Sequence, residues 1–448
     1  MNQDNADLLN EIQQFQQANP EIEFVDLICL DIPGHFYGKR YPMDMLVKIA
    51  KGSVLKLPKN CTLLGVQGGV YPIGDYSLND GDPDAPRRLI PGTLKPVTWE
   101  NKPLAQMLIT SDNTDAPIEF EPRQVLSEVT QRLTHKGLHP VVAFELEFYL
   151  FDKQLNQGKP QFPRDPLSDD ADDQANMHIE RLSRFSNVLD DIAATAKLQG
   201  IDATIITAEL GPGQFEINFN HHNDPHVAAD WAAMFIRLTR GVALKHGYRA
   251  SFMAKPYLEH PGNGMHTHIS VYDDYGNNVL LNNNQQALRH AVNGCLTLLP
   301  SLMPIFAPNL NSYRRFNGVV NTAQLASWGF EDRDASVRIP ESNDKNLRLE
   351  IRLPGADANP YLTLAALLSS IEYGLENPQE PIAPLNDNRD SGIEFAKDVL
   401  QAVQHMASHE VIQCALGKEF VFVYCENKRL DYLQFMQDIS EREYRWYL

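Results

Sequence analysis

The chain has 448 residues, of which 43% are hydrophobic and 22% charged, a composition typical of a globular protein with two or three domains. Its formal net charge of −19 disfavours nucleic acids and anionic membrane surfaces as partners. The N-terminus has no secretory pattern, no uncharged apolar run reaches the roughly 18 residues of a membrane span, and no cysteines form a Cys-x-x-Cys pair. We therefore expect a cytoplasmic protein with reduced thiols.

The first part of the chain is predicted to be a small strand-rich domain. Apolar residues at helical spacing predict an amphipathic helix over 1–20, and a strand is expected over 24–31. Residues 50–115 carry many glycines and prolines between short strand-like runs. We therefore place a first domain at residues 1–110.

The second domain is predicted over residues 111–448 and begins with a polar boundary segment over 111–121. A helix is expected to begin at Pro122 and to end at Gly137, because proline favours the first helical turn and glycine the C-cap. An acidic loop over 165–173 is interpreted as solvated.

Further elements are expected along the second domain. Strands are predicted over 209–220, 248–253 and 266–272. Asn359 and Pro360 have the N-cap and first-turn pattern of a helix. A loop over 376–392 is expected to lead to two C-terminal helices.

Three short segments place polar residues at alternate positions. In a strand, residues i and i+2 share a face, so each segment directs its polar side chains into one space. The polar residues are Glu145 and Glu147, His266, His268 and Ser270, and Arg348, Glu350 and Arg352. The two neighbouring glutamates lie in the apolar run 141–151, and burying unpaired carboxylates costs roughly several kcal/mol each. A divalent cation is the simplest compensation.

Two further glutamates, Glu209 and Glu216, flank a Gly-Pro-Gly turn. Each pattern also has a structural interpretation, because glutamates beside a turn are commonly solvated, strand histidines are common in cores, and Arg-Glu-Arg ladders are common on surfaces. The combination favours a site. Several glutamates with a His-x-His pair suit Mg²⁺ or Mn²⁺ better than a structural zinc ion.

Several arginines accompany these groups in an otherwise acidic chain, and fixed cations of this kind suggest a polyanionic ligand such as a nucleoside triphosphate. They are Arg314, Arg333, Arg338, Arg348 and Arg352. The chain has no Gly-x4-Gly-Lys-Ser/Thr loop and no strand-linked Gly-x-Gly-x-x-Gly, so arginines and metal would hold the nucleotide. Two ions with such an arginine set would suit phosphoryl transfer from ATP.

A series of motifs between residues 145 and 361 resembles the glutamine synthetase family. They include Phe144-Glu-Leu-Glu-Phe148, Gly211-Pro-Gly-Gln-Phe-Glu216, Gly264-Met-His-Thr-His-Ile-Ser270, Asn311-Ser-Tyr-Arg-Arg315 and Arg348-Leu-Glu-Ile-Arg352. The resemblance implies an α+β fold, with a small N-terminal β-grasp domain and a larger catalytic domain of antiparallel sheet and flanking helices. It also implies a homo-oligomer, a dodecamer of two hexameric rings with active sites between neighbouring subunits.

The resemblance implies a role for each site residue. One Mg²⁺ or Mn²⁺ ion would be held by Glu147, Glu209 and Glu216, and the other by Glu145, His266 and Glu350. ATP would be contacted by His268, Ser270, Arg338 and Arg348. The glutamate carboxylate and the transferred phosphate would be held by Arg314, Arg333 and Arg352, with Arg333 acting in catalysis and the backbone of Gly262 facing glutamate.

The chain departs from the ammonia-using members of the family at three places. Their Asp-Gly-Ser-Ser segment corresponds here to Leu63-Leu-Gly-Val-Gln-Gly-Gly69, which has no acid. Their glutamate-bearing flap corresponds to Asn321-Thr-Ala-Gln324, and Pro261 replaces the asparagine at the glutamate amino group. Other segments resemble the branch of the family that joins glutamate to putrescine. We therefore expect L-glutamate, ATP and a primary amine such as putrescine as substrates, with Glu209 as the candidate acceptor of the amine's proton.

Alternatives stay open at this point. The amine could be ammonium, ethanolamine or another polyamine. The chain could also be a non-catalytic family member that binds ATP or glutamate and regulates partners, although its complete set of metal ligands disfavours that reading. A di-metal hydrolase that does not use ATP would leave the arginines unexplained.

Overall fold

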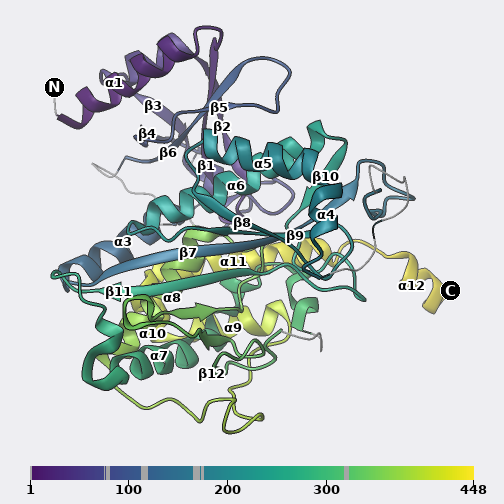
Figure 1. Ribbon diagram of the computed structural model, residues 1–448. Helices are drawn as coiled ribbons and strands as arrows, with labels where there is room; N and C mark the ends of the chain where they lie inside the picture. The colour runs from purple at the N-terminus through teal and green to yellow at the C-terminus, as the bar shows by residue number, and fades with distance from the viewer. Residues whose placement is uncertain are drawn as a thin grey trace.

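The computed structural model describes residues 3–74, 76, 81–112, 120–164, 172, 176–316 and 322–448. Most of the polar boundary segment and of the acidic loop, and Asn321 of the flap segment, lie outside these residues. The described residues form a smaller N-terminal sheet and a larger second sheet with helices against it (Figure 1). The expected α+β fold is confirmed.

The N-terminal sheet has the strand order β2-β1-β6-β4-β3, with β5 paired to β6 and β1 parallel to β6. Its strands are β1 (Phe24–Leu30), β2 (Phe36–Pro42), β3 (Leu55–Pro58), β4 (Asp84–Leu89), β5 (Lys95–Val97) and β6 (Leu104–Ser111). Helices α1 (Gln3–Ala18) and α2 (Met43–Ala50) join the sheet in a hydrophobic core of its own, in which Ile12 is fully buried. The helix predicted over 1–20 is therefore confirmed.

The second sheet has the strand order β12-β13-β14-β11-β7-β9-β8, with β10 paired to β7. Its strands are β7 (His139–Asp152), β8 (Ala203–Ala208), β9 (Gln214–Phe219), β10 (Tyr248–Ser251), β11 (Met265–Tyr272), β12 (Trp328–Phe330), β13 (Val337–Ile339) and β14 (Leu349–Ile351). The long strands β7 and β11 run side by side across the middle of the molecule (Figure 1). The predicted strand over 209–220 is shorter than expected, because residues 209–213 form the turn before β9.

Helices pack against this sheet and against one another. They are α3 (Pro122–His135), α4 (Ile179–Arg184), α5 (Ser186–Leu198), α6 (Pro225–Lys245), α7 (Asn282–Phe306), α8 (Pro360–Glu376), α9 (Val399–Ser408), α10 (Glu410–Leu416), α11 (Lys418–Phe435) and α12 (Glu441–Tyr447). The predicted start of α3 at Pro122 is confirmed, and Gly137 follows its end with a φ of +69°.

The α8 cap also matches its prediction, since the Asn359 side chain accepts a hydrogen bond of 3.1 Å from the backbone N–H of Tyr361. Four helices, not two, follow the loop over 376–392. The difference arises where backbone conformation interrupts the helical run, as at Gly417, whose φ of +93° separates α10 from α11.

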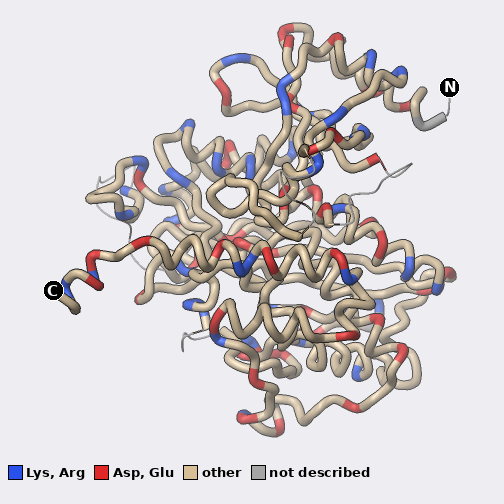
Figure 2. Tube along the Cα trace, turned by 180° about the vertical axis from the view of Figure 1, so that it is seen from behind, with Lys and Arg blue, Asp and Glu red and all other residues tan. Residues whose placement is uncertain are grey.

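Acidic and basic residues are both scattered over the described part of the chain (Figure 2), so the charge is not confined to one segment. Among the described residues, no helix combines the length and the apolarity needed to cross a membrane.

Candidate active site

Strand β7 separates the hydrophobic core from a polar face. Phe144, Leu146 and Phe148 are buried in the core, whereas Glu145 and Glu147 lie on the opposite face with side chains 24% and 13% exposed. This is the arrangement that the alternation of residue types predicts, because neighbouring strand residues point to opposite faces.

The pairing register brings the other predicted groups to the same face. Glu145 lies opposite His266 on β11, and Glu147 lies opposite Glu216 on β9. His268 in turn lies opposite Glu350 on β14. Because directly opposed residues of antiparallel strands share a face, four adjacent strands present one cluster of carboxylates and imidazoles.

The two histidines hold Glu145 between them. Nδ1 of His266 lies 3.2 Å from Oε2 of Glu145, and Nε2 of His268 lies 3.0 Å from its Oε1. Burial would raise the pKa of Glu145, but hydrogen bonds and charge from the two histidines hold it well below its usual range. These contacts therefore favour the ionised form of Glu145.

The fifth glutamate of the cluster, Glu209, lies in the turn between β8 and β9. A buried ion pair outside the cluster holds this turn, because Arg181 donates a 2.6 Å hydrogen bond to the carbonyl of Glu209 and another to the carbonyl of Gly211. Arg181 pairs with Asp172 at 2.6 Å, and Asp172 accepts a 2.7 Å hydrogen bond from the N–H of Gly213. The interpretation of the acidic loop as solvated is therefore wrong for Asp172, which is buried because it has these partners.

The carboxylates on the β9 side repel one another. Burial and the charge of Glu147 raise the pKa of Glu209 to about 7. Burial and the charges of Glu147 and Glu145 raise the pKa of Glu216 to about 9. Neither Glu209 nor Glu216 forms an ion pair with a described cationic side chain, so the protein's own cations do not stabilise the charged forms of these carboxylates.

These donors fit a hard divalent cation. Ligand atoms of Glu145, Glu216 and His266 all lie within 4.8 Å of one another, and so do those of Glu145, His268 and Glu350. Oxygen-rich sets with one imidazole suit Mg²⁺ or Mn²⁺. The two groups share Glu145 and differ from the two triads that the resemblance implies, since His268 replaces His266 beside Glu350.

Arginines line the other side of the same space. Glu350 is paired with Arg338 at 2.7 Å and with Arg352 at 2.6 Å. Burial alone would raise the pKa of Glu350, but the charges of His266 and Arg352 lower it. Arg352 also donates to the carbonyl of Arg333 at 3.1 Å.

These groups surround a cavity of about 350 Å³, which we call the acidic cavity. The predicted residues that line it are Glu145, Glu147, Glu209, Glu216, Gly262, His266, Arg333, Arg338, Glu350 and Arg352.

Arg314 does not line the acidic cavity, and its neighbour Arg315 does. Arg315 is buried and donates to the carbonyls of Leu353 and Arg352 at 2.7 and 3.1 Å. The two adjacent arginines are equivalent in the sequence, and only the 3₁₀ helix Ser312–Phe316 decides which of them faces inward.

An adjoining cavity of about 310 Å³ also contains Glu145 in its wall. Three residues predicted to contact ATP line it: His268, Ser270 and Arg348. Nε of Arg348 donates to Nδ1 of His268 at 3.1 Å, while the hydroxyl of Ser270 donates to the carbonyl of Leu347 at 2.9 Å. Arg338, the fourth predicted ATP contact, lies in the acidic cavity instead. Glu145 lines both cavities, so a molecule in the second cavity that reaches Glu145 lies next to the carboxylate cluster.

Of the three places where the sequence departs from ammonia-using enzymes, two contribute residues to the wall of the acidic cavity and one does not. Pro261 and Thr322 line the acidic cavity. The segment 63–69 instead packs against α11 of the same chain, where the N–H of Val66 donates to Asp431 at 2.9 Å.

The chain is similar to known glutamate–amine ligases over nearly its whole length. The protein family described as "Glutamine synthetase, catalytic domain" matches residues 119–447 of this chain. The chain is 38% identical to gamma-glutamylputrescine synthetase of Escherichia coli (strain K12), with 98% of this chain and 94% of that protein covered. It is 28% identical to a glutamate–isopropylamine ligase of Pseudomonas, with 100% of this chain and 99% of that protein covered.

A solved structure gives the same fold. The chain superposes on a GmaS/ADP complex with a TM-score of 0.82 and 25% identity, covering 97% of this chain and 99% of that one. Together with the carboxylate–histidine face, these matches show that the chain belongs to the glutamine synthetase family of ATP-dependent glutamate–amine ligases.

Proposed function

We propose that this chain joins the γ-carboxylate of L-glutamate to putrescine, with ATP cleaved to ADP and phosphate. The observation that carries the proposal is the acidic cavity, in which unbalanced carboxylates face arginines and which shares Glu145 with a second cavity. Putrescine as the amine is supported by the 38% identity to gamma-glutamylputrescine synthetase.

The reaction proceeds in two transfers. In the first, the γ-carboxylate oxygen of glutamate attacks the γ-phosphorus of ATP, so that γ-glutamyl phosphate forms and ADP leaves. In the second, the amine nitrogen attacks the γ-carbonyl carbon, the carbon–oxygen bond to phosphate breaks, and the amine loses a proton. When bound, Mg²⁺ or Mn²⁺ would neutralise phosphate charge, held by Glu145, Glu147, Glu209, Glu216, His266 and Glu350.

The chain's own residues supply orientation and charge. Arg333, Arg338 and Arg352 present guanidiniums to the acidic cavity, where they would neutralise the phosphate and hold the glutamate carboxylate. Arg315 takes the place first given to Arg314 in this set. His268, Ser270 and Arg348 would contact ATP in the adjoining cavity, and the backbone of Gly262 would face glutamate.

The amine needs a proton acceptor. An amine with a pKa near that of lysine, about 10.4, is almost wholly protonated at neutral pH. We assign this role to Glu209, which lines the acidic cavity on the turn before β9 and has no cationic partner among the described residues.

We further propose that residues 1–110 and 111–448 act as an N-terminal and a catalytic domain within a homo-oligomeric ring of the dodecameric type. The N-terminal sheet has its own hydrophobic core, which supports this division.

Isotope transfer tests the acyl phosphate route. With L-glutamate labelled by ¹⁸O in the γ-carboxylate, ATP, Mg²⁺ and putrescine, we expect one ¹⁸O atom in each phosphate released and γ-glutamylputrescine as the product in mass spectra. Unlabelled phosphate, or phosphate released without amide formation, would refute the reaction as written.

A further inference from the structure

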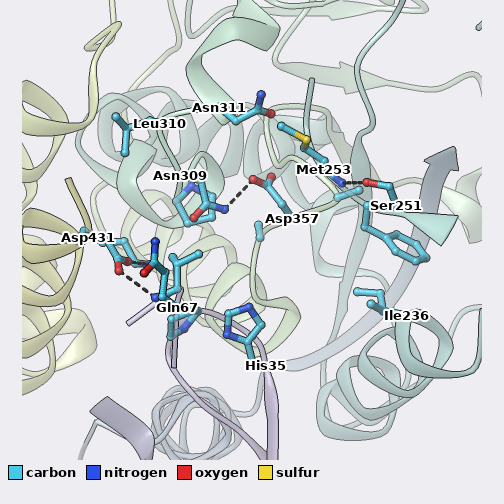
Figure 3. A pocket seen from close by; sticks show the side chains of 18 of the residues that line it. His35, Gln67, Ile236, Ser251, Met253, Asn309, Leu310, Asn311, Asp357 and Asp431 are labelled. Atoms are coloured by element: carbon cyan, nitrogen blue, oxygen red, sulfur yellow. Dashed lines mark hydrogen bonds and ion pairs between the residues drawn. The ribbon is translucent and has the colours of Figure 1, made fainter. Parts of the chain in front are cut away.

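A larger cavity lies apart from the acidic cavity, where the N-terminal sheet meets the rest of the chain (Figure 3). It has a volume of about 650 Å³ and is bounded by the loop after β1, by α6, by the segment after β10, by residues 308–314 and by the end of α11. In Figure 3, Asp431 and Gln67 lie on one side of this space and Ser251 and Met253 on the other. Segments distant in sequence thus enclose one space, which we call the arginine cavity.

Most of the wall of the arginine cavity is apolar. Its apolar side chains include Leu30, Phe36, Ile236, Phe252, Met253 and Phe435. Met253 is 44% exposed and Phe435 is 55% exposed, so the cavity is open to solvent at these residues. Size and lining are those of small-molecule sites, which span roughly 300–1,000 Å³ and combine apolar walls with a few polar groups.

Most polar side chains in the wall already have partners. Asp431 accepts hydrogen bonds from the N–H of Val66 and the hydroxyl of Tyr71, both at 2.9 Å, and pairs with Lys428 at 3.1 Å. Asn311 is hydrogen-bonded through both ends of its amide to the backbone of Lys255. These groups hold the walls together and have little capacity left for a ligand.

Asp357 is the other acid in the wall. Its Oδ2 accepts hydrogen bonds from Asn309 at 2.8 Å and from the hydroxyl of Ser312 at 2.7 Å. Burial raises the pKa of Asp357.

Two arginines in the wall differ from all of these groups. Arg240 and Arg314 form no ion pair and no side-chain hydrogen bond with any described residue. The guanidinium of Arg240 lies 5.6 Å from the ring centre of Phe252, a cation–π contact that leaves its N–H groups unused. Each guanidinium offers five N–H donors, so these two arginines leave cationic donors unused in a chain with a net charge of −19.

We propose that the arginine cavity binds a small organic anion, whose acidic group is held by Arg240 and Arg314 and whose apolar body lies against Phe252, Met253 and Phe435. Guanidiniums suit this role because they bind carboxylates and phosphates through two parallel hydrogen bonds. The site is separate from the acidic cavity and does not depend on the proposed reaction.

Two fluorescent probes that differ in one charge test the proposal. The anionic probe is 8-anilinonaphthalene-1-sulfonate, and the neutral probe is N-phenyl-1-naphthylamine, which lacks the sulfonate. Each is titrated into the full-length protein with saturating Mg²⁺ and ADP, which occupy the proposed nucleotide site. We expect one binding event per chain, tighter for the anionic probe than for the neutral one.

The double variant Arg240→Gln with Arg314→Gln should weaken binding of the anionic probe at least about tenfold and leave that of the neutral probe nearly unchanged, because only charge-assisted hydrogen bonds are lost. Met253→Trp, which fills the open side of the cavity and keeps both charges, should weaken both probes. Arg249→Gln, an exposed arginine outside the cavity wall, is the matched control and should bind both probes as the parent does.

Equal binding of the anionic probe to the parent and to either the double variant or Met253→Trp would overturn the proposal. So would a parent protein that binds no anionic probe, as expected if a partner subunit fills the cavity. Thermal unfolding of each variant checks folding. If the double variant does not fold, the two single arginine variants and Met253→Trp decide the outcome.

Discussion

The acidic cavity and the arginine cavity are both lined by residues of the short helix Ser312–Phe316, yet they carry opposite charge. Arg315 lines the first and Arg314 the second. In the acidic cavity, the strand register sets carboxylates against one another. In the arginine cavity, loops and helix ends leave two guanidiniums against an apolar wall. The contrast teaches that side-chain charge left unbalanced by the protein marks the places where a ligand completes the structure.

The largest expected effect concerns the acidic cavity. Glu145→Gln removes a charge that both His266 and His268 contact and that both groups of metal-ligand atoms share. We expect kcat/KM for phosphate release to fall about 10²–10³-fold, the scale seen when a group that stabilises developing charge is lost. Glu23→Gln, a change at an exposed glutamate that lines neither cavity, is the control. If the activity of Glu145→Gln were within a few-fold of that of the parent, Glu145 would not be a metal ligand needed for the reaction.

The next effect concerns how the acidic cavity is held. Arg181→Met removes the donor to the carbonyls of Glu209 and Gly211 and leaves Asp172 buried without its partner. We expect the Mg²⁺ concentration for half-maximal activity to rise about 10–100-fold, as for other groups that orient metal ligands. Arg181→Lys should recover part of the loss, which a purely structural role of the residue would not produce. An unchanged Mg²⁺ requirement in Arg181→Met would contradict the role given to this ion pair.

The third effect is a pH dependence of the metal-free protein. Glu216 has a usual pKa near 4.5, which rises to about 9 in the folded chain. Between these values the folded state binds a proton that the unfolded state has released, so the free energy of unfolding should fall as the pH rises from about 5 to 9.

Thermal unfolding in EDTA measures this slope. Glu216→Gln should flatten the slope, and saturating Mg²⁺ should flatten it in the parent protein. Parallel slopes for the parent and for Glu216→Gln in EDTA would show that the carboxylates do not repel one another as described.

The smallest effect concerns the arginine cavity. Asn359 caps α8 and also donates a 3.1 Å hydrogen bond to the carbonyl of Asp31, beside the loop that lines this cavity. Asp398 caps α9 through a 2.9 Å hydrogen bond from the N–H of Gln401. Asn359→Ala and Asp398→Ala should each lower the free energy of unfolding by about 1 kcal/mol. Only Asn359→Ala should also weaken binding of the anionic probe. Equal binding of the probe by both variants would show that the α8 cap does not support the arginine cavity.

Much of the acidic cavity could be predicted because it is built on regular strands. The alternation of Glu145 and Glu147 with apolar neighbours predicts their common face, and the His-x-His pattern predicts the same for β11. The order in which the strands pair was not available from any one segment, yet that order brings His268 opposite Glu350. The donor atoms that lie closest together in the metal-free chain are therefore not those of the triads that the family resemblance implies.

Features outside regular strands could not be predicted in this way. Arg314 and Arg315 are adjacent residues of the same type. Only the path of the short helix Ser312–Phe316 determines that Arg315 lines the acidic cavity and Arg314 the arginine cavity. In the sequence, Asp172 is one acid among several in an acidic loop. Its burial depends on Arg181 and on the N–H of Gly213 in the turn before β9, which lies far from Asp172 along the chain. The arginine cavity is formed by segments between residues 30 and 435, so no local pattern indicates it.

The proposed function requires that the acidic cavity activates glutamate for attack by putrescine. Phosphate release should be measured with L-glutamate, ATP and Mg²⁺ across ammonium, putrescine, spermidine, ethanolamine and methylamine. We expect the highest kcat/KM with putrescine and little release with ammonium. Release with ammonium but none with putrescine would contradict the proposed function, and no release with any amine would favour a non-catalytic family member.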